Sequence, residues 1–361
     1  DQIYNVALIW WVIKQNGSAE ILGILGAVYI IPSICIGPFL GAIADRLNKK
    51  SVIVFMDLIR GILMIHIGIC SAMFDPTILA CLPNIVHEEK KIFKLQSLME
   101  LIRNFVIIFG LICGGIILLM FKPEIAFILN GISFSISAIS ETFIVFYHQQ
   151  TKEINFKEIM LDLKNGIKFI CSNGVLKYLM PIFGLMNMIG LPILQVIIPM
   201  LLFKKIGTSI SMGAFYSIMG AGGILGSLIL SKYNIEGKLL VLIGSFMDFI
   251  STILLLIISD LYGFIIIGLL YGLSASWTQI GANFIFLREV PTEMRTKVFS
   301  FRRMISQIFI PIGMLVIGTV VEKTSIIIAI SISIIVLGFI FVLLLIGYKW
   351  SRPILSENIV L

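Results

Sequence analysis

The chain has 361 residues, of which 58% are apolar and 13% are charged, and its mean hydropathy is +1.06. This composition excludes a soluble globular protein with a charged surface and indicates a polytopic membrane protein. The net charge of +7 comes from Lys and Arg in short loops, a pattern that orients helices in a bilayer and does not indicate nucleic-acid binding. The five cysteines form no CxxC pair, the three histidines are scattered, and no P-loop or nucleophile elbow is present, so we expect no metal, no cofactor and no catalytic residues.

Hydrophobic segments long enough to cross a membrane follow one another along the chain. A spanning helix needs about 20 apolar residues, and on this measure we expect eleven segments. They are 3–13, 20–44, 52–74, 98–120 and 125–147, followed by 175–203, 209–231, 238–259, 261–287, 298–321 and 325–348. The chain begins inside an apolar pattern without a Met, so we expect the first helix to be truncated.

The longest polar stretch separates these segments into two sets. Within it, apolar residues recur at helical spacing among lysines, which predicts an amphipathic helix on the inner membrane surface; they are Ile154, Phe156, Ile159, Met160, Leu163, Ile167 and Ile170. A plain linker between two halves is the other interpretation. We therefore expect an N-terminal helical half at 1–147, a cytoplasmic linker at 148–173 and a C-terminal helical half at 174–361.

The distribution of basic residues predicts an orientation. Lys and Arg gather in the loops at 45–50, 87–94, 148–177 and 288–303 and in the tail after residue 348, which we expect to be cytoplasmic. The turns at 14–20, 121–124, 204–208, 260–262 and 322–324 carry few charges and should face outside. The prediction is a multi-pass membrane protein whose central loop and C-terminus are cytoplasmic.

One region breaks this pattern. The loops at 45–50 and 84–96 both have cytoplasmic character, although the residues between them cross the membrane once. We therefore expect that a segment is missing near 65–71, so that the helix 3–4 hairpin is shortened and the intact protein has twelve helices. A re-entrant hairpin is the alternative.

A glycine-spaced helix end, an acid and a basic loop follow one another at 37–50. Gly37 and Gly41 share one helix face, where a neighbouring helix can approach closely. An ordinary basic loop that obeys the positive-inside rule is the alternative interpretation. The motif-bearing residues are Gly41, Asp45, Arg46, Lys49 and Lys50, and the string resembles the signature loop between helices 2 and 3 of the major facilitator superfamily, with Asn48 where a glycine is usual.

Further stretches at 1–19 and 290–300 are similar to the drug and siderophore exporters of this superfamily, a branch that includes macrolide efflux proteins and the enterobactin exporter. Residues 222–227 echo 37–42, and 246–250 echo 55–59, which favours two related halves over chance similarity between apolar helices. The resemblance implies an all-α major facilitator fold of two six-helix halves and proton-driven export. It also implies that Asp45 docks near 296–300, at the cytoplasmic end of helix 11. Arg46 and the basic residues of the same loop would then hold the two helical halves together.

Placing an ionisable side chain inside the membrane costs free energy, so each such residue indicates a structural or functional role. Asp57 with Arg60, and Glu100 with Arg103, are three apart and can pair on one helix face, either as structural pairs or in coupling. Asp248 mirrors Asp57 in the second half. Glu141 has no basic neighbour in sequence and is our first candidate for proton coupling, and Asp1 is the second.

Polar residues in two later helices are candidates for a substrate cavity. Pro181, Pro192 and Pro199 interrupt the seventh helix, and irregular backbone is tolerated where it lines a cavity. The candidates are Tyr4, Asn5, Asn187, Gln195, Trp277, Gln279 and Asn283. Because no cluster of Lys or Arg lies within the apolar segments, we expect a neutral or cationic amphipathic substrate.

These observations predict a non-enzymatic, proton-coupled exporter of small amphipathic compounds of the drug or macrolide type, working by alternating access. Its partners would be the substrate, protons and the lipid bilayer, and it would act as a monomer. A siderophore exporter on the same fold and a non-transporting degenerate membrane protein are the alternatives.

Overall fold

The computed structural model describes residues 2–15, 18–35, 49–62, 106, 109–110, 113–118, 120–143, 156–230, 235–291 and 295–350. Regular structure in these ranges is helical throughout, as the apolar segments predict. Several predicted features lie outside them. These are Asp1, Gly41, Asp45, Arg46, Glu100, Arg103 and the expected gap at 65–71.

Two groups of helices lie before and after α8 (Phe156–Ser172) in the chain. The N-terminal group contains α1 (Gln2–Lys14), α2 (Ala19–Cys35), α4 (Lys49–Ile62) and α7 (Pro123–Glu141). The C-terminal group contains α9 (Gly174–Pro192), η1 (Ile193–Ile197), α10 (Ile198–Lys205), α11 (Ser209–Leu230), α12 (Gly237–Ile257), α13 (Leu261–Glu289), α14 (Arg295–Ile308), α15 (Ile310–Lys323) and α16 (Ile326–Trp350). Within the described residues, six helices are long and apolar enough to cross a membrane. The predicted all-helical membrane fold is confirmed.

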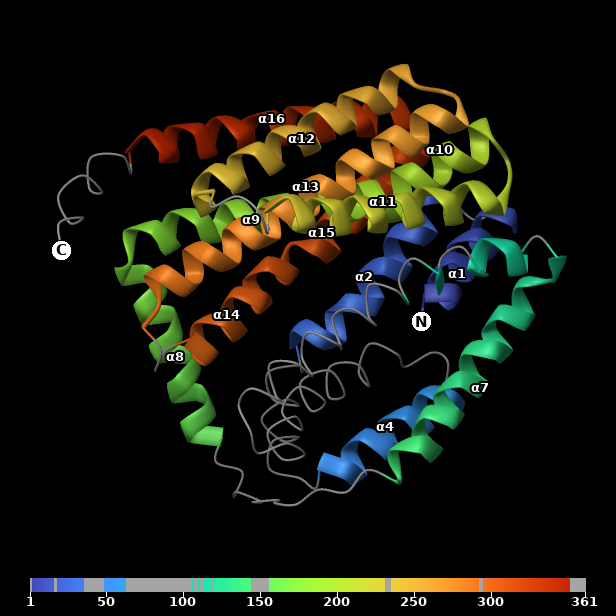
Figure 1. Ribbon diagram of the computed structural model, residues 1–361, viewed down its shortest axis with the longest axis horizontal. Coiled ribbons are helices and arrows are strands. Elements are labelled where there is room, and N and C mark those ends of the chain that lie inside the picture. The colour runs from blue at the N-terminus through green and yellow to red at the C-terminus, as the bar shows by residue number, and fades with distance from the viewer. Residues whose placement is uncertain are drawn as a thin grey trace.

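The long helices run roughly alongside one another, and α8 lies across one end of the bundle (Figure 1). We call this end the α8 end and the opposite one the far end. The turns from α1 to α2 and from α10 to α11 lie at the far end (Figure 1). Towards the α8 end, α4 and α7 diverge from the C-terminal group, so the two groups are closest at the far end (Figure 1).

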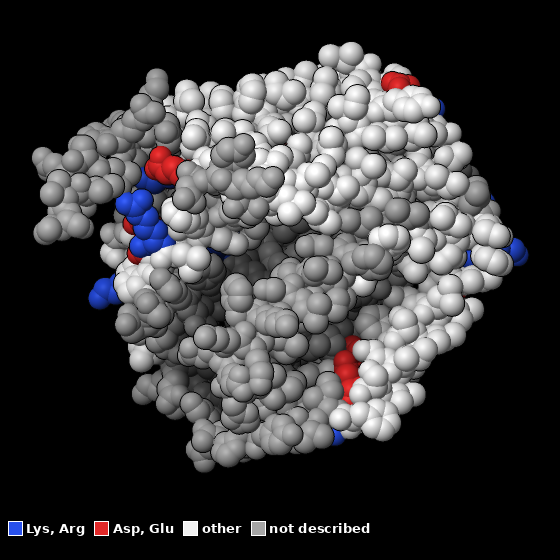
Figure 2. Space-filling view, viewed as in Figure 1, with Lys and Arg blue, Asp and Glu red and all other residues white. Residues whose placement is uncertain are grey.

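Charged side chains occupy the margins of this bundle. On the face drawn in Figure 2, most of the described surface carries neither sign of charge, and a group of Lys and Arg side chains lies at the α8 end. An uncharged belt between charged ends is the surface that a bilayer requires of a spanning protein.

The predicted segment at 175–203 is one continuous helix, formed by α9, η1 and α10, whose middle is a π-helical turn. The N–H of Ile198 donates to the carbonyl of Ile193, five residues back. The next bond of that kind would run from residue 199 to Leu194, but Pro199 has no N–H. The buried hydroxyl of Tyr216 on α11 donates to the Leu194 carbonyl instead. Proline therefore frees a backbone acceptor that a neighbouring helix satisfies.

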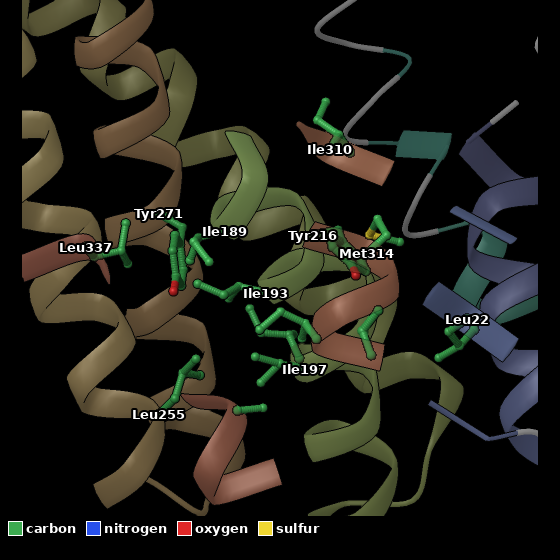
Figure 3. Close-up of a cluster of buried hydrophobic side chains, with 14 of the residues drawn as sticks. Leu22, Ile189, Ile193, Ile197, Tyr216, Leu255, Tyr271, Ile310, Met314 and Leu337 are labelled. Carbon is green, nitrogen blue, oxygen red and sulfur yellow. The ribbon is translucent and has the colours of Figure 1, made fainter. Parts of the chain in front are cut away.

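We expect Tyr216→Phe to lower the free energy of unfolding by about 1–3 kcal/mol, because it leaves the Leu194 carbonyl without this donor among fully buried side chains. Figure 3 shows Tyr216 beside Ile193 and Ile197 in this core. Thermal unfolding of the detergent-purified protein measures the loss. Tyr262→Phe, at a tyrosine that is 79% exposed, is the control and should stay within about 0.5 kcal/mol of the parent. Equal melting temperatures for the two variants would contradict the assignment.

The predicted single helix at 298–321 is wrong in one respect. The structure has two helices, α14 and α15, separated at Phe309. Pro311 cannot donate to the carbonyl four residues back, so the hydrogen-bond ladder is interrupted there. The N–H of Gly313 then donates to Phe309 at 3.0 Å and restarts the ladder. A Cβ on Gly184 of α9 would lie 2.6 Å from Cδ2 of Phe309, so the ring of Phe309 packs directly against α9 at the position where the helix is interrupted.

The glycines of the predicted repeat serve helix packing in the C-terminal group. A Cβ on Gly222 of α11 would overlap the carbonyl oxygen of Leu269 on α13. From the other side, a Cβ on Gly272 would overlap the carbonyl oxygen of Met219. Because neither glycine has a side chain, the backbones of α11 and α13 touch over this length.

Candidate functional site

The two groups of helices meet most closely where α2 packs along α15. A Cβ on Gly23 would overlap the carbonyl oxygen of Met314, and one on Gly318 would lie 2.8 Å from the carbonyl oxygen of Ala19. At the end of this contact the N–H of Ala19 donates to Glu322 Oε2 at 3.1 Å. These residues lie in the first two turns of α2 and the last three turns of α15, so the contact belongs to the far end.

Two more helix pairs close the same end. The rings of Trp10 on α1 and Phe203 on α10 pack edge to face, 5.5 Å between centroids. The hydroxyl of Ser209 on α11 donates to the carbonyl of Gly115 at 3.1 Å; Gly115 lies in the helical residues 113–118, which precede α7 and belong to the N-terminal group. The far end is thus sealed by three separate contacts between the N-terminal and C-terminal groups.

On the C-terminal group, a polar and aromatic cluster gathers around Arg302 of α14. Its Nη1 donates to Asn283 Oδ1 at 2.8 Å, and Gln279 Nε2 lies 3.4 Å from the same oxygen. The guanidinium lies 4.4 Å from the ring centroid of Phe286 and 5.6 Å from that of Phe183. We call these five residues the Arg302 cluster.

Sequence reasoning found two members of this cluster, Gln279 and Asn283, and missed its cation. It counted Arg302 among the basic residues of the cytoplasmic loop at 288–303, although the helix predicted at 298–321 also includes this residue. In the structure, α14 begins at Arg295 and carries Arg302 two turns along. The alternation of apolar residues with Arg302 in 298–308 was the available signal. A helix there directs one basic residue toward α9 and α13.

The other predicted cavity residues lie in separate places. Asn187 lies one turn beyond Phe183 on α9 and donates to the carbonyl of that residue at 3.0 Å. Gln195 in η1 has its Oε1 3.2 Å from where a Cβ on Gly26 would be, so it belongs to the sealed contact. Trp277 donates to the carbonyl of Gly226 at 3.2 Å and holds α13 to α11.

The two candidates on α1 point in different directions. Tyr4 packs its ring against Phe127 of α7, 5.5 Å between centroids. Asn5, the next residue, is exposed. Of the seven predicted cavity residues, the structure therefore brings Gln279 and Asn283 into direct contact and places Asn187 one turn from the Phe183 of their cluster.

The N-terminal group buries two of the predicted carboxyl groups. Asp57 on α4 is 1% exposed and Glu141 on α7 is 7% exposed, and α4 packs against α7. The hydroxyl of Ser137 donates to Glu141 Oε1 at 3.2 Å. Glu141 also continues the buried face of α7 that includes Asn130, so both carboxyl groups lie in the interior of this group.

Two further charged candidates lie on α12 and α4. Asp248 is half-buried on α12, and Lys50 is half-buried in the first turn of α4. The backbones of Lys49 and Arg60 belong to α4, while their side chains lie outside the described part of the structure.

Comparison with known proteins gives the family. A sequence profile described as "Major Facilitator Superfamily" matches residues 1–313 of this chain. The chain is 21% identical over 318 residues to "Putative bacilysin exporter BacE" of Bacillus amyloliquefaciens, covering 81% of this chain and 78% of that protein.

Solved structures support the same fold. A point mutant of the nucleoside transporter NupG superposes with a TM-score of 0.77 at 14% identity, covering 97% of this chain and 96% of that one. A POT family transporter in complex with 5-aminolevulinic acid has a TM-score of 0.71 at 14% identity, covering 98% and 93%. With the family profile spanning most of its length, this multi-pass membrane transporter belongs to the major facilitator superfamily.

Proposed function

We propose that this transporter exports small amphipathic compounds of the drug or macrolide type across the bacterial plasma membrane, driven by proton entry and working by alternating access. The observation that carries this proposal is the sealing of one end of the bundle by three contacts between the two helix groups, while α4 and α7 diverge from the C-terminal group toward the other end (Figure 1). A transporter that alternates must have a contact of this kind that can break and a partner surface that can close.

The basic residues supply the direction. α8 and the end of α16 lie at the α8 end, together with the Lys and Arg group of Figure 2. By the positive-inside rule this end would be cytoplasmic, so the contacts at the far end would lie on the outer side of the membrane. The export direction is supported by the relative named as a bacilysin exporter.

Proton coupling is assigned to the N-terminal group. A buried carboxyl group can carry a proton because burial brings its charged and neutral forms closer in free energy. Glu141 fits this role because it is 7% exposed, and Asp57 on the neighbouring α4 is 1% exposed. Substrate contacts are assigned to the C-terminal group of helices, so protons and substrate would bind to different groups of helices.

The test is transport by the full-length gene product in proteoliposomes. A fluorescent cationic dye and a labelled macrolide are loaded, and a pH gradient is imposed with the proton flux directed against the expected substrate flux. Gradient-driven movement that a protonophore abolishes would support proton-coupled export. Movement that persists at the same rate with the protonophore would exclude coupling, and a lack of movement of both probes would exclude this substrate class.

A further inference from the structure

Asp248 places a carboxyl group in the middle of a membrane-spanning helix. α12 runs from Gly237 to Ile257, so Asp248 lies eleven residues after its start and nine before its end. At 1.5 Å per residue this is about 15 Å from either end. Because the apolar part of a bilayer is about 30 Å thick, this position is near its centre. A negative charge there costs free energy unless a cation or hydrogen-bond donors compensate it.

The helices packed against Asp248 supply no cation. α12 packs mainly against α13 and α16, which lie beside it (Figure 1). The sequence has no Lys, Arg or His at 239–287 or 325–347, which covers the middle of all three helices. Tyr271 of α13 is the titratable side chain that interacts with Asp248, and α16 has none at 325–347. An ionised Asp248 would therefore have no basic side chain beside it in these helices.

The internal repeat of the sequence agrees with this. In the repeat, Asp248 corresponds to Asp57 of α4. In the first copy Arg60 follows three residues after the acid, a spacing that allows an ion pair on a helix. The matching position in the second copy is Ser251, which is 0% exposed and donates to a backbone carbonyl of its own helix at 2.7 Å. The second copy therefore has the acid without the base.

The hydroxyl groups around Asp248 donate their protons elsewhere. A hydroxyl has one proton to donate and two lone pairs that accept. Ser274 of α13 hydrogen-bonds to the side chain of Asp248, and it donates its proton to the carbonyl of Gly244 at 2.9 Å. Thr252 donates to the backbone carbonyl of Asp248 at 2.8 Å, so Tyr271, 2.7 Å from the Thr252 hydroxyl, is the donor of that bond. The proton between Asp248 and Ser274 must therefore come from the carboxyl group.

The same site can also hold the ionised form of Asp248. Rotation of the Ser274 hydroxyl would turn its proton from the Gly244 carbonyl toward the carboxylate. The Gly244 carbonyl would keep the bond from the N–H four residues later, because both residues lie inside α12. Neither protonation state then leaves one of these groups without a partner, which is what a site that takes up and releases a proton requires.

We propose that Asp248 is a second proton-binding site of the transporter, which carries its proton as a neutral acid in the described conformation and releases it during the transport cycle. This inference rests on the proposed proton-driven transport, and it adds a proton to the C-terminal group of helices, besides the one assigned to Glu141. A proton suits the site better than a metal cation, because the neighbouring hydroxyl groups already bond to one another and to backbone carbonyls.

Infrared spectroscopy of the detergent-purified full chain detects this proton directly. A neutral carboxylic acid has a carbonyl-stretch band that a carboxylate lacks, and an aspartic acid in water is ionised at about pH 7. We expect the parent to show one such band more than Asp248→Asn at about pH 7, and this band should disappear reversibly as the pH is raised to about 10. The amide can still donate to Ser274, so folding should be retained.

The matched control is Asp260→Asn. Asp260 is exposed and accepts from the N–H of Gly263 at 3.2 Å, a role that a carboxylate and an amide oxygen both fill. This substitution should remove no band of a neutral acid.

Transport in proteoliposomes tests the release of the proton. Asp248→Asn cannot lose a proton, so gradient-driven efflux should fall at least about threefold, while exchange of labelled for unlabelled substrate without a gradient should persist. Asp248→Glu restores a titratable group and should recover part of the loss. Asp260→Asn should keep the parent rate.

Four results would overturn the proposal. These are equal infrared bands in the parent and Asp248→Asn, a band that persists at about pH 10, a band that Na+ removes at constant pH, and a parent-like efflux rate in Asp248→Asn. If Asp248→Asn fails to fold, Ser274→Ala takes its place. It removes the hydrogen-bond partner and should shift the band of the neutral acid, and an unshifted spectrum would contradict the assignment.

The spectra and the transport rates fail independently. The spectra are recorded without transport, so a protein that shows the band and moves no probe refutes the export function alone. A protein that exports the probes and lacks the band refutes the second proton site alone.

Discussion

Glu141→Gln is expected to lower proton-driven efflux to below about one tenth of the parent rate, because an amide cannot take up and release a proton within the working pH range. The substitution keeps the shape of the side chain, and its amide oxygen can still accept from Ser137, which donates to the carboxylate at 3.2 Å in the structure. Folding and substrate binding should therefore be retained. The measurement is substrate movement in proteoliposomes with and without an imposed pH gradient.

The matched control is Glu124→Gln, which removes an exposed carboxyl group from the first turn of the same helix. It should leave the gradient-driven rate unchanged. Exchange of labelled for unlabelled substrate without a gradient should persist in both variants, since it needs no net proton movement. If Glu141→Gln still concentrates substrate with the gradient, Glu141 is not the coupling group, and the buried Asp57 becomes the next position to test.

Gly23→Ala is expected to open the far end of the molecule. Its new Cβ would overlap the carbonyl oxygen of Met314 across the contact between the two helix groups, so the sealed state loses stability relative to a state in which α2 and α15 are apart. With a cysteine at Ser209, which is 3% exposed in the sealed state, and the native cysteines replaced, labelling by a membrane-impermeant maleimide should become at least about fivefold faster.

Gly272→Ala is the contrasting variant. Its Cβ would overlap the carbonyl oxygen of Met219, but α11 and α13 belong to the same group of helices, so the substitution does not act on the contact between the two groups. The expected result is a loss of stability of about 1–3 kcal/mol without faster labelling. Gly190→Ala, where a Cβ would meet nothing within 4 Å, should be neutral or stabilise by up to about 1 kcal/mol. Slow labelling in Gly23→Ala together with a lowered melting temperature would show that the far-end contact is a fixed part of the fold.

The sequence by itself determined the class of the protein and most of its helices. Hydrophobic length placed the later segments within about three residues of the observed bounds, because a run that must cross a bilayer is defined by composition and not by its neighbours. The helical spacing of apolar residues at 154–170 likewise predicted α8, observed at Phe156–Ser172. The sequence also indicated the buried carboxyl group of Glu141, because an acidic residue inside an apolar segment can be recognised from the sequence alone.

Only the tertiary structure decided which of these residues meet. Sequence reasoning counted Arg302 with a loop, and nothing local shows that α14 directs it onto Phe183 and Phe286, which are 119 and 16 positions away in sequence. The same holds for Gly23, whose close partner Met314 is on the other group of helices. Helix formation in a membrane depends on local composition, whereas the pairing of helices depends on the shapes of surfaces that are far apart along the chain, and a site built between helices is specified by that pairing.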